Sequence, residues 1–564
     1  MGLPPALLPL RNPVFARLWF AYIVTSLGTW LQNTGAGWLM TTLSPSPLTV
    51  SLVQAATILP FFLLALPAGA IADIVDRRIF LIGTQVWTMA AAALLAAMTI
   101  AHMTTPASLL LLTFAIGIGS AMTGPAWGAI VPELVPREDL VQAIALNGIG
   151  FNIARALGPA LAGFLVVVAG SGFAFALFAV SILAVIGALF SWRRAPSRSA
   201  LPREHLMGAI RAGMRFVANT PAMRATMVRS FAYSLPAAAP WAVLPLVVRE
   251  QLGLGAGMYG LILGLMGVGG VASGLLLPNF RHYANRSTIV LASSLCSCAG
   301  MAVLGLSRHW VPAAFGMAVF GIGWVAAFST LQAAAQLSAP PWVRARALAI
   351  YQISYNGALA FGSFGWGWLG TQIGLADVLL VAAAGGAVLA VAVRVFGIDQ
   401  AAAGLPTATA AQRRPEAPAA ELATVLPHAR GRLLETMHYR ATAPQREAFL
   451  ETMAEVRMVR GRAGALFWQL YEDVAHPDGW METWAMESWV DHLREATRLS
   501  DADQAALARA SVFQRDPSVP LPHRYIAVEP SLHGWLSRQE GRAYRGGVDA
   551  ERRAPWPPTQ PETT

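Results

Sequence analysis

The chain has 564 residues, of which 55% are hydrophobic and only 12% are charged. Soluble domains carry about 25% charged residues, so this composition excludes a soluble protein and indicates a membrane protein. The net charge of +10 does not indicate nucleic-acid binding, because the arginines lie in short loops between apolar segments, where they are typical of membrane orientation.

The first 398 residues predict an all-α membrane domain with twelve transmembrane helices. A hydrocarbon core of about 30 Å is crossed by roughly 20 apolar residues in a helix. The segments that meet this requirement are 16–42, 48–72, 79–101, 107–131, 140–168, 172–192, 223–248, 256–280, 287–306, 311–337, 346–371 and 377–396.

The arginines are unevenly distributed between the two sets of loops. One set holds Arg77, Arg78, Arg137, the segment 193–224, Arg281, Arg286, Arg344 and Arg346. The other set holds only Arg249 and Arg308. Because arginines are retained on the cytoplasmic side, we expect a multi-pass protein of the bacterial inner membrane with both termini in the cytoplasm.

A weak internal repeat divides the twelve helices into two pseudo-symmetric halves. The segment around Asn152, Gly158 and Gly163 recurs about 204 residues later around Asn356, Gly362 and Gly367. Such duplication of a membrane unit is typical of transporters. We therefore predict a half at 1–192, a half at 223–398, and a cytoplasmic central loop at 193–222 that contains a basic amphipathic helix.

After Gly397 the composition becomes that of a soluble region. Residues 399–429 are rich in Ala, Pro and Thr and predict a flexible linker. Residues 430–530 show the order βαββαβ, with a hairpin at Asp478-Gly479, and predict a small α+β domain of the ferredoxin-like type. Residues 531–564 form a polar, proline-rich tail that we expect to be disordered.

Arg155 is the most unusual residue of the membrane region, since it lies about 15 residues into the fifth predicted span. A charged side chain near mid-bilayer costs at least roughly 2.5–3.5 kcal/mol and should face a cavity or the bundle interior. Arg155 could bind an anionic substrate group or could satisfy helix carbonyls as a structural residue. Other polar candidates for substrate or ion binding are Gln32, Asn33, Asn152, Tyr351 and Asn356.

Stretches in the membrane region and in the C-terminal region resemble known families. The loop Gly69-Ala-Ile-Ala-Asp73-Ile-Val-Asp76-Arg77-Arg78 resembles the signature of the major facilitator superfamily, with Ile74 and Asp76 departing from it. The run PxxxAxxPELVPREDLxxA, followed by NxxR and Gly158-Pro159, resembles the secretion-effector branch that includes enterobactin exporters. The segments GALFWQLYED and HRYIAVE resemble a small domain similar to antibiotic-biosynthesis monooxygenases.

The resemblance implies gating roles for several residues. Gly69, Asp73, Arg77 and Arg78 would form a latch at the cytoplasmic end, although the two arginines could also serve only orientation. Gly158, Pro159 and Gly163 would form the bend of the fifth helix in antiporters, or could serve helix packing alone. No carboxylate lies deep in a predicted span, so Glu133 at the end of the fourth span is the remaining candidate for proton coupling.

The sequence therefore predicts a secondary active transporter that exports a siderophore-like, drug-like or other small molecule by alternating access. The alternatives are import, and a membrane-tethered sensor or enzyme whose C-terminal domain carries the activity. We predict no catalytic residues, no cofactor and no metal site, since the histidines and cysteines lack ligand spacing. The expected partners are the substrate, a proton or other ion, and the lipid bilayer, with no nucleic acid. Dimerisation through the C-terminal domain stays open.

Overall fold

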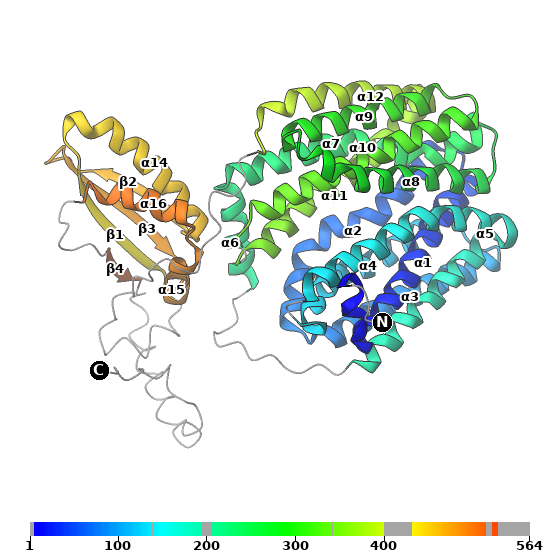
Figure 1. Cartoon of the computed structure of the whole chain (residues 1–564), viewed down its shortest axis with the longest axis horizontal. Helices are drawn as coiled ribbons and strands as arrows, with labels where there is room; N and C mark the ends of the chain where they lie inside the picture. The colour runs from blue at the N-terminus through cyan, green and yellow to red at the C-terminus, as the bar shows by residue number, and fades with distance from the viewer. Residues whose placement is uncertain are drawn as a thin grey trace, which may run out of the picture. The chain divides into compact units, whose positions relative to one another are not determined.

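The computed structural model describes residues 5–136, 139–192, 206–340, 342–399, 431–514 and 522–527. The chain divides into two compact units, Met1–Leu405 and Pro406–Thr564. Figure 1 shows a helical bundle in the first unit and a small sheet with helices in the second. The predicted linker beyond residue 399, most of the central loop before residue 206, and the predicted tail at 531–564 lie outside the described residues.

The first unit consists of long helices that follow the predicted spans closely. A short helical turn, η1 (Pro5–Arg11), precedes them, and two more, η3 (Val247–Gln251) and η4 (Val393–Val395), follow α7 and α12. The long helices are α1 (Pro13–Leu43), α2 (Pro47–Ile74), α3 (Arg77–Ile100), α4 (Pro106–Leu134), α5 (Leu140–Ser191), α7 (Pro221–Leu246), α8 (Ala256–Phe280), α9 (Arg286–Leu306), α10 (Trp310–Leu337), α11 (Arg344–Ile373) and α12 (Leu375–Ala392).

Ten helices of the described residues are long and apolar enough to cross a membrane. One of them, α5, covers both the fifth and the sixth predicted spans, and its helical backbone breaks at Gly170, where φ is +82°. Such a φ favours glycine, which has no Cβ to clash. The helix α11 is not among the ten because its polar residues lower its hydropathy. When α5 is counted as two spans and α11 is added, the described helices correspond to the twelve predicted spans.

Local sequence determines where several helices begin. The Asn12 side chain accepts hydrogen bonds from the backbone of Val14 and Phe15 at the start of α1. Asp76 does the same for Arg78 and Ile79 at the start of α3, and Thr105 forms a capping box at the start of α4. These side chains satisfy backbone N–H groups that have no partner within the helix.

The membrane unit is built from two groups of helices, α1–α5 and α7–α12 (Figure 1). Each group has its own apolar core, and the two groups contact each other mainly where α2 packs on α11 and α5 packs on α8. The predicted amphipathic helix is present as α6 (Leu206–Ala218), which packs against α7 and α11. Its Phe216 ring meets Trp342 edge to face at 6.1 Å.

The second unit contains a four-stranded antiparallel sheet in the order β2-β3-β1-β4. This order is the one expected for the predicted ferredoxin-like domain. Two short helices, α15 and α16, occupy the place of the single second helix in the predicted order. The elements are β1 (Leu433–Arg440), η6 (Ala443–Gln445), α14 (Arg446–Ala463), β2 (Phe467–Glu472), β3 (Gly479–Met486), α15 (Trp489–Arg498), α16 (Asp501–Ser511) and β4 (His523–Ile526).

Candidate functional site: an arginine and three tryptophans between the two halves

Glycines bring α5 and α8 into backbone contact across the boundary between the halves. A Cβ atom at Gly260 would lie 2.5 Å from the Pro159 carbonyl oxygen and 2.6 Å from the Gly163 Cα atom. A Cβ atom at Gly267 would lie 2.7 Å from the Arg155 carbonyl oxygen. Small residues in membrane helices permit such close packing. The predicted Gly-Pro segment therefore packs directly against the other half.

The contact between α2 and α11 is the pseudo-symmetric counterpart. A Cβ atom at Gly367 would overlap the Ser51 side chain, and one at Gly357 would lie 2.9 Å from the Phe62 ring. The Phe62 and Phe361 rings also meet edge to face at 5.5 Å. The repeat found in the sequence thus supplies both of the main interfaces between the halves.

Arg155 lies beside this interface in a small pocket to which both halves contribute. Trp30 of α1 and Arg155 of α5 come from the first half, and Trp241 of α7 and Trp324 of α10 come from the second. Leu263, Met266, Gly267 and Val325 complete the lining. The Arg155 guanidinium rests against Gly270, where a Cβ atom would lie 3.2 Å from Nη2. The pocket combines one cation with aromatic walls.

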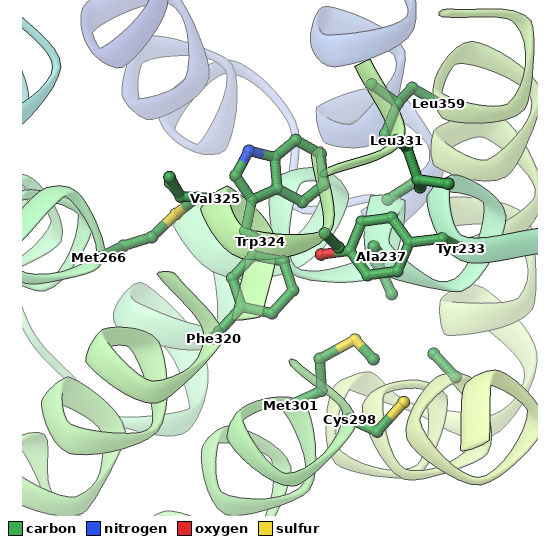
Figure 2. Close-up of a cluster of buried hydrophobic side chains, with 14 of the residues drawn as sticks. Tyr233, Ala237, Met266, Cys298, Met301, Phe320, Trp324, Val325, Leu331 and Leu359 are labelled. Carbon is green, nitrogen blue, oxygen red and sulfur yellow. The ribbon is translucent and has the colours of Figure 1, made fainter. Parts of the chain in front are cut away.

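The three tryptophans continue into a larger aromatic cluster. Trp241 contacts Trp30 at a ring distance of 6.4 Å and Trp324 at 5.6 Å. Figure 2 shows Phe320 and Tyr233 flanking the Trp324 ring. The ring centre of Tyr355 in α11 lies 6.3 Å from that of Trp324, and Tyr355 interacts electrostatically with Arg155. Leu359, which replaces the arginine in the sequence repeat, is buried in the same cluster.

Contacts between the halves also close the end of the bundle that holds the α1–α2 and α7–α8 connections. The Trp38 ring of α1 stacks on Tyr259 of α8 at 5.9 Å. Arg249 donates a hydrogen bond from Nη1 to the Thr41 hydroxyl over 3.1 Å. We call this the far end, because it lies opposite the end that holds Arg78, Arg281 and Arg344. The Arg155 pocket is therefore covered on the far side.

At the arginine-rich end, Arg78 has a role that its sequence position did not reveal. Its guanidinium donates hydrogen bonds to the carbonyl oxygens of Leu189 and Phe190 over 2.8 and 3.0 Å. These carbonyls lie in the last turn of α5, where the regular helical hydrogen bonds end, and the Leu189 oxygen also accepts from the Trp192 amide. Arg77 begins α3, and Gly69 lies within α2. The side chains of Asp73, Glu133 and Asn152 lie outside the described ones.

The remaining predicted residues are distributed through the core of the bundle. Gln32 is 1% exposed and Tyr351 is fully buried, whereas Asn33 and Asn356 are half-buried. Tyr351 lies beside Ser230 of α7. Gly158 permits the approach of Trp30, since a Cβ atom there would lie 2.5 Å from the Trp30 Cβ atom. Gly158 thus connects the predicted Gly-Pro segment to the aromatic pocket.

Sequence reasoning missed the three tryptophans, although a signal for them was present. Tryptophans usually lie at the two membrane surfaces, but Trp30, Trp241 and Trp324 lie deep within their spans. The spacing of Gly260 and Gly264 is also typical of a close helix interface. Neither signal identifies the partner helix, so neither would have predicted the pocket.

The C-terminal unit contains a buried network of charged side chains. Arg460 donates hydrogen bonds to Glu482 and Glu495 over 3.1 and 2.9 Å, and its guanidinium lies 3.6 Å from the Trp484 ring centre. His492 bonds to Glu435 over 2.9 Å. Glu435, His492 and Glu495 each place one atom of a kind that can bind a metal ion within 4.8 Å of the others. Because Arg460 and Arg524 already pair with the two carboxylates, we interpret the cluster as an ion network.

We expect this network to make the C-terminal unit less stable at alkaline pH. Burial opposes the charged form of His492, but hydrogen bonds to Glu435 and Glu495 outweigh it and raise its pKa to about 9. Since the unfolded pKa is about 6.5, the stabilisation is complete below that pH and is lost as the pH rises through 9. The loss is roughly 3 kcal/mol at most.

The pH dependence of this stability can be measured by hydrogen exchange of residues 431–527 in the full chain. The exchange rates at pH 6 and pH 9.5 are compared after correction for the intrinsic exchange rate. His492→Gln should remove most of the pH dependence. His438→Gln is the matched control, because His438 is exposed on the adjacent strand β1. An equal pH dependence in all three proteins would contradict the assignment.

Comparison with known proteins places the chain among membrane transporters. The family model described as transmembrane secretion effector matches residues 5–531. The staphyloferrin A transporter of Staphylococcus aureus is 24% identical over 290 residues, which cover 50% of this chain and 71% of that protein. The enterobactin exporter EntS of Escherichia coli O81 is 25% identical over 203 residues, which cover 36% and 48%. The chain thus spans about half the length of the enterobactin exporter.

Solved structures of other transporters share the fold of the membrane unit. An inward-facing, unoccupied bacterial homologue of the human lysosomal transporter Spinster gives a TM-score of 0.52 at 15% identity, and 70% of this chain and 95% of that chain are covered. The nucleoside transporter NupG gives 0.53 at 13% identity, with 68% and 98% covered. These similarities establish that the membrane unit shares the fold of these transporters.

Proposed function

The chain belongs to the transmembrane secretion effector family of the major facilitator superfamily, and from this premise we propose that it exports a small anionic molecule with aromatic or apolar groups. Transport would be secondary and active, and driven by a proton or another ion. The substrate class includes siderophore-like compounds, as the names of the relatives suggest. The family consists of transporters and not of enzymes, so the alternative of a tethered enzyme is not favoured.

One observation carries the proposal: Arg155 occupies a pocket that both halves build, with Trp30, Trp241 and Trp324 as its walls. An arginine can bind a carboxylate or phenolate with two parallel hydrogen bonds. Aromatic rings provide a large apolar surface for a planar substrate. Because the wall residues belong to different halves, a relative movement of the halves would open the pocket and weaken substrate binding.

The proposed cycle is alternating access between the two sides of the membrane. The far end is closed by the Trp38–Tyr259 stack and by the glycine contacts between α5 and α8. Export would require these contacts to separate while contacts form at the arginine-rich end. We propose Gly69, Asp73, Arg77 and Arg78 as participants in that second closure, and Gly158, Pro159 and Gly163 as the packing surface that separates.

Further elements of the proposal concern orientation and coupling. The arginine distribution supports cytoplasmic termini, so the far end would face the periplasm. Glu133 is the proposed proton-binding residue, and Asn152, Gln32, Asn33, Tyr351 and Asn356 are proposed to line the translocation path. Dimerisation through the C-terminal domain is a separate proposal, based on its resemblance to antibiotic-biosynthesis monooxygenases.

Deletion of the gene tests export directly. We expect a compound to accumulate in the cells and to decrease in the medium, and we expect wild-type protein to restore both levels. Metabolites should be compared by mass spectrometry with and without iron limitation, since that comparison separates siderophore-like substrates from others. Complementation with residues 1–405 alone distinguishes the alternatives: restored export excludes a function that resides in the C-terminal domain. Unchanged metabolite levels in the deletion strain would contradict the proposal.

A further inference from the structure

A second and larger cavity lies within the second half of the bundle, between α7, α9 and α12. Together with the open space at its mouth, it measures about 430 Å³. These three helices pack against one another at one edge of the bundle (Figure 1). The deep wall is mostly apolar and includes Ala237, Val290 and Met301, and the Tyr233 and Ser297 hydroxyls there bond to each other. None of the Arg155 pocket residues takes part. The cavity is therefore distinct from the proposed substrate site.

The mouth of the cavity opens on a surface that a bilayer would cover. Ala390 and Leu291 at the mouth are partly exposed, whereas Val290 and Met301 behind them are buried. The surrounding outer surface of α9, α12 and η4 carries large exposed apolar side chains, namely Leu295, Val388, Val391 and Val395. A lipid acyl chain can therefore reach the cavity from the side without crossing an aqueous phase.

One end of the cavity is polar and positively charged. Arg229 is 2% exposed, and its guanidinium donates hydrogen bonds to the carbonyl oxygens of Val393 and Arg394. The Arg394 side chain is exposed at the cavity rim. Asp399 acts on Arg229 electrostatically and accepts a hydrogen bond from the Ser287 amide. Two arginines, Arg229 and Arg394, thus lie near one carboxylate, so the rim keeps an excess of positive charge.

We infer that this cavity binds an anionic phospholipid from the leaflet at the arginine-rich end. The headgroup phosphate lies at the rim formed by Arg229 and Arg394, and one acyl chain enters the apolar space beside Val290 and Met301. Basic pockets between transmembrane helices are suited to anionic headgroups. The combination of a charged rim, an apolar interior and a mouth on the lipid-facing surface fits an amphiphile better than a soluble anion, which needs no apolar wall.

Thermal unfolding of the delipidated full-length protein in detergent tests the inference. Phosphatidylglycerol should raise the unfolding midpoint by at least about 3 °C, while phosphatidylcholine with the same acyl chains should have a smaller effect. Ala390→Trp fills the mouth and Arg394→Gln removes rim charge, and both should abolish the difference between the two lipids. Val388→Trp is the matched control, because Val388 lies on the exposed surface of the same helix.

Any of the three following outcomes would overturn the inference. Equal stabilisation by the two lipids would mean that the headgroup is not recognised. A preserved preference for phosphatidylglycerol in Arg394→Gln and Ala390→Trp would place lipid binding elsewhere. Stabilisation by glycerol phosphate alone, to the same extent as by phosphatidylglycerol, would indicate a site for a soluble anion. Arg394→Gln keeps the test valid if Ala390→Trp fails to fold, since the Arg394 side chain is exposed and the hydrogen bond from Arg229 goes to the Arg394 carbonyl, which the substitution keeps.

Discussion

Arg155→Ala should reduce export roughly 100-fold, and Arg155→Lys roughly tenfold, at unchanged amounts of protein in the membrane. The physical reason is the loss of a paired, charge-assisted contact to the substrate within a pocket that aromatic rings shield from water. Lysine restores the charge but not the planar fork of donors. Export per molecule should be measured with the compound that accumulates in the deletion strain, together with the amount of inserted protein.

Arg229 provides the matched control for a structural intramembrane arginine. Its guanidinium bonds to the carbonyl oxygens of Val393 and Arg394, so Arg229→Ala leaves helix-end carbonyls without that partner and should lower the amount of folded protein. If Arg155→Ala behaved in the same way, with normal export per remaining molecule, Arg155 would be structural. The alternative that the sequence left open would then be correct.

Gly260→Val should prevent the far end from closing and reduce export roughly ten- to 100-fold. A Cβ atom at this position would press on the Pro159 carbonyl and on the Gly163 Cα atom, and backbone atoms cannot move aside as a flexible side chain would. Overpacking of this kind costs typically 1–3 kcal/mol, which is enough to shift a balanced equilibrium between two conformations.

The conformational effect has a readout that does not depend on transport. Thr41→Cys places a thiol at the closed far end, where Thr41 is 4% exposed. In a protein whose Cys296 and Cys298 are replaced, Gly260→Val should increase the labelling of the thiol at position 41 by a membrane-impermeant reagent. Gly257→Val is the control, because a Cβ atom there meets only a Val167 methyl group at 3.5 Å. Equal labelling and equal export in both variants would show that this contact does not control closure.

Much of the fold could be predicted because it depends on local properties of the chain. Apolar segment length placed the helices of the membrane unit within a few residues of their observed ends. The hairpin at Asp478-Gly479 placed β2 and β3 of the C-terminal unit. Where the predicted order has one second helix, the structure has two, α15 and α16, capped by Ser488 and Ser500.

The candidate site depends both on local sequence and on the packing of helices that are distant in the chain. The position of Arg155 along an apolar segment is a local property, so the amino-acid sequence was enough to identify an intramembrane charge. The recurrence of the Gly158–Gly163 segment in the second half is likewise visible in the sequence. What these residues contact depends on how the helices pack in three dimensions. Trp241 and Trp324 reach Arg155 from helices of the other half, Gly260 is the partner of Gly163, and Arg78 binds carbonyls more than 100 residues away. Such pairings arise when distant helices bury their surfaces against each other, and a pattern read along one segment does not contain its partner.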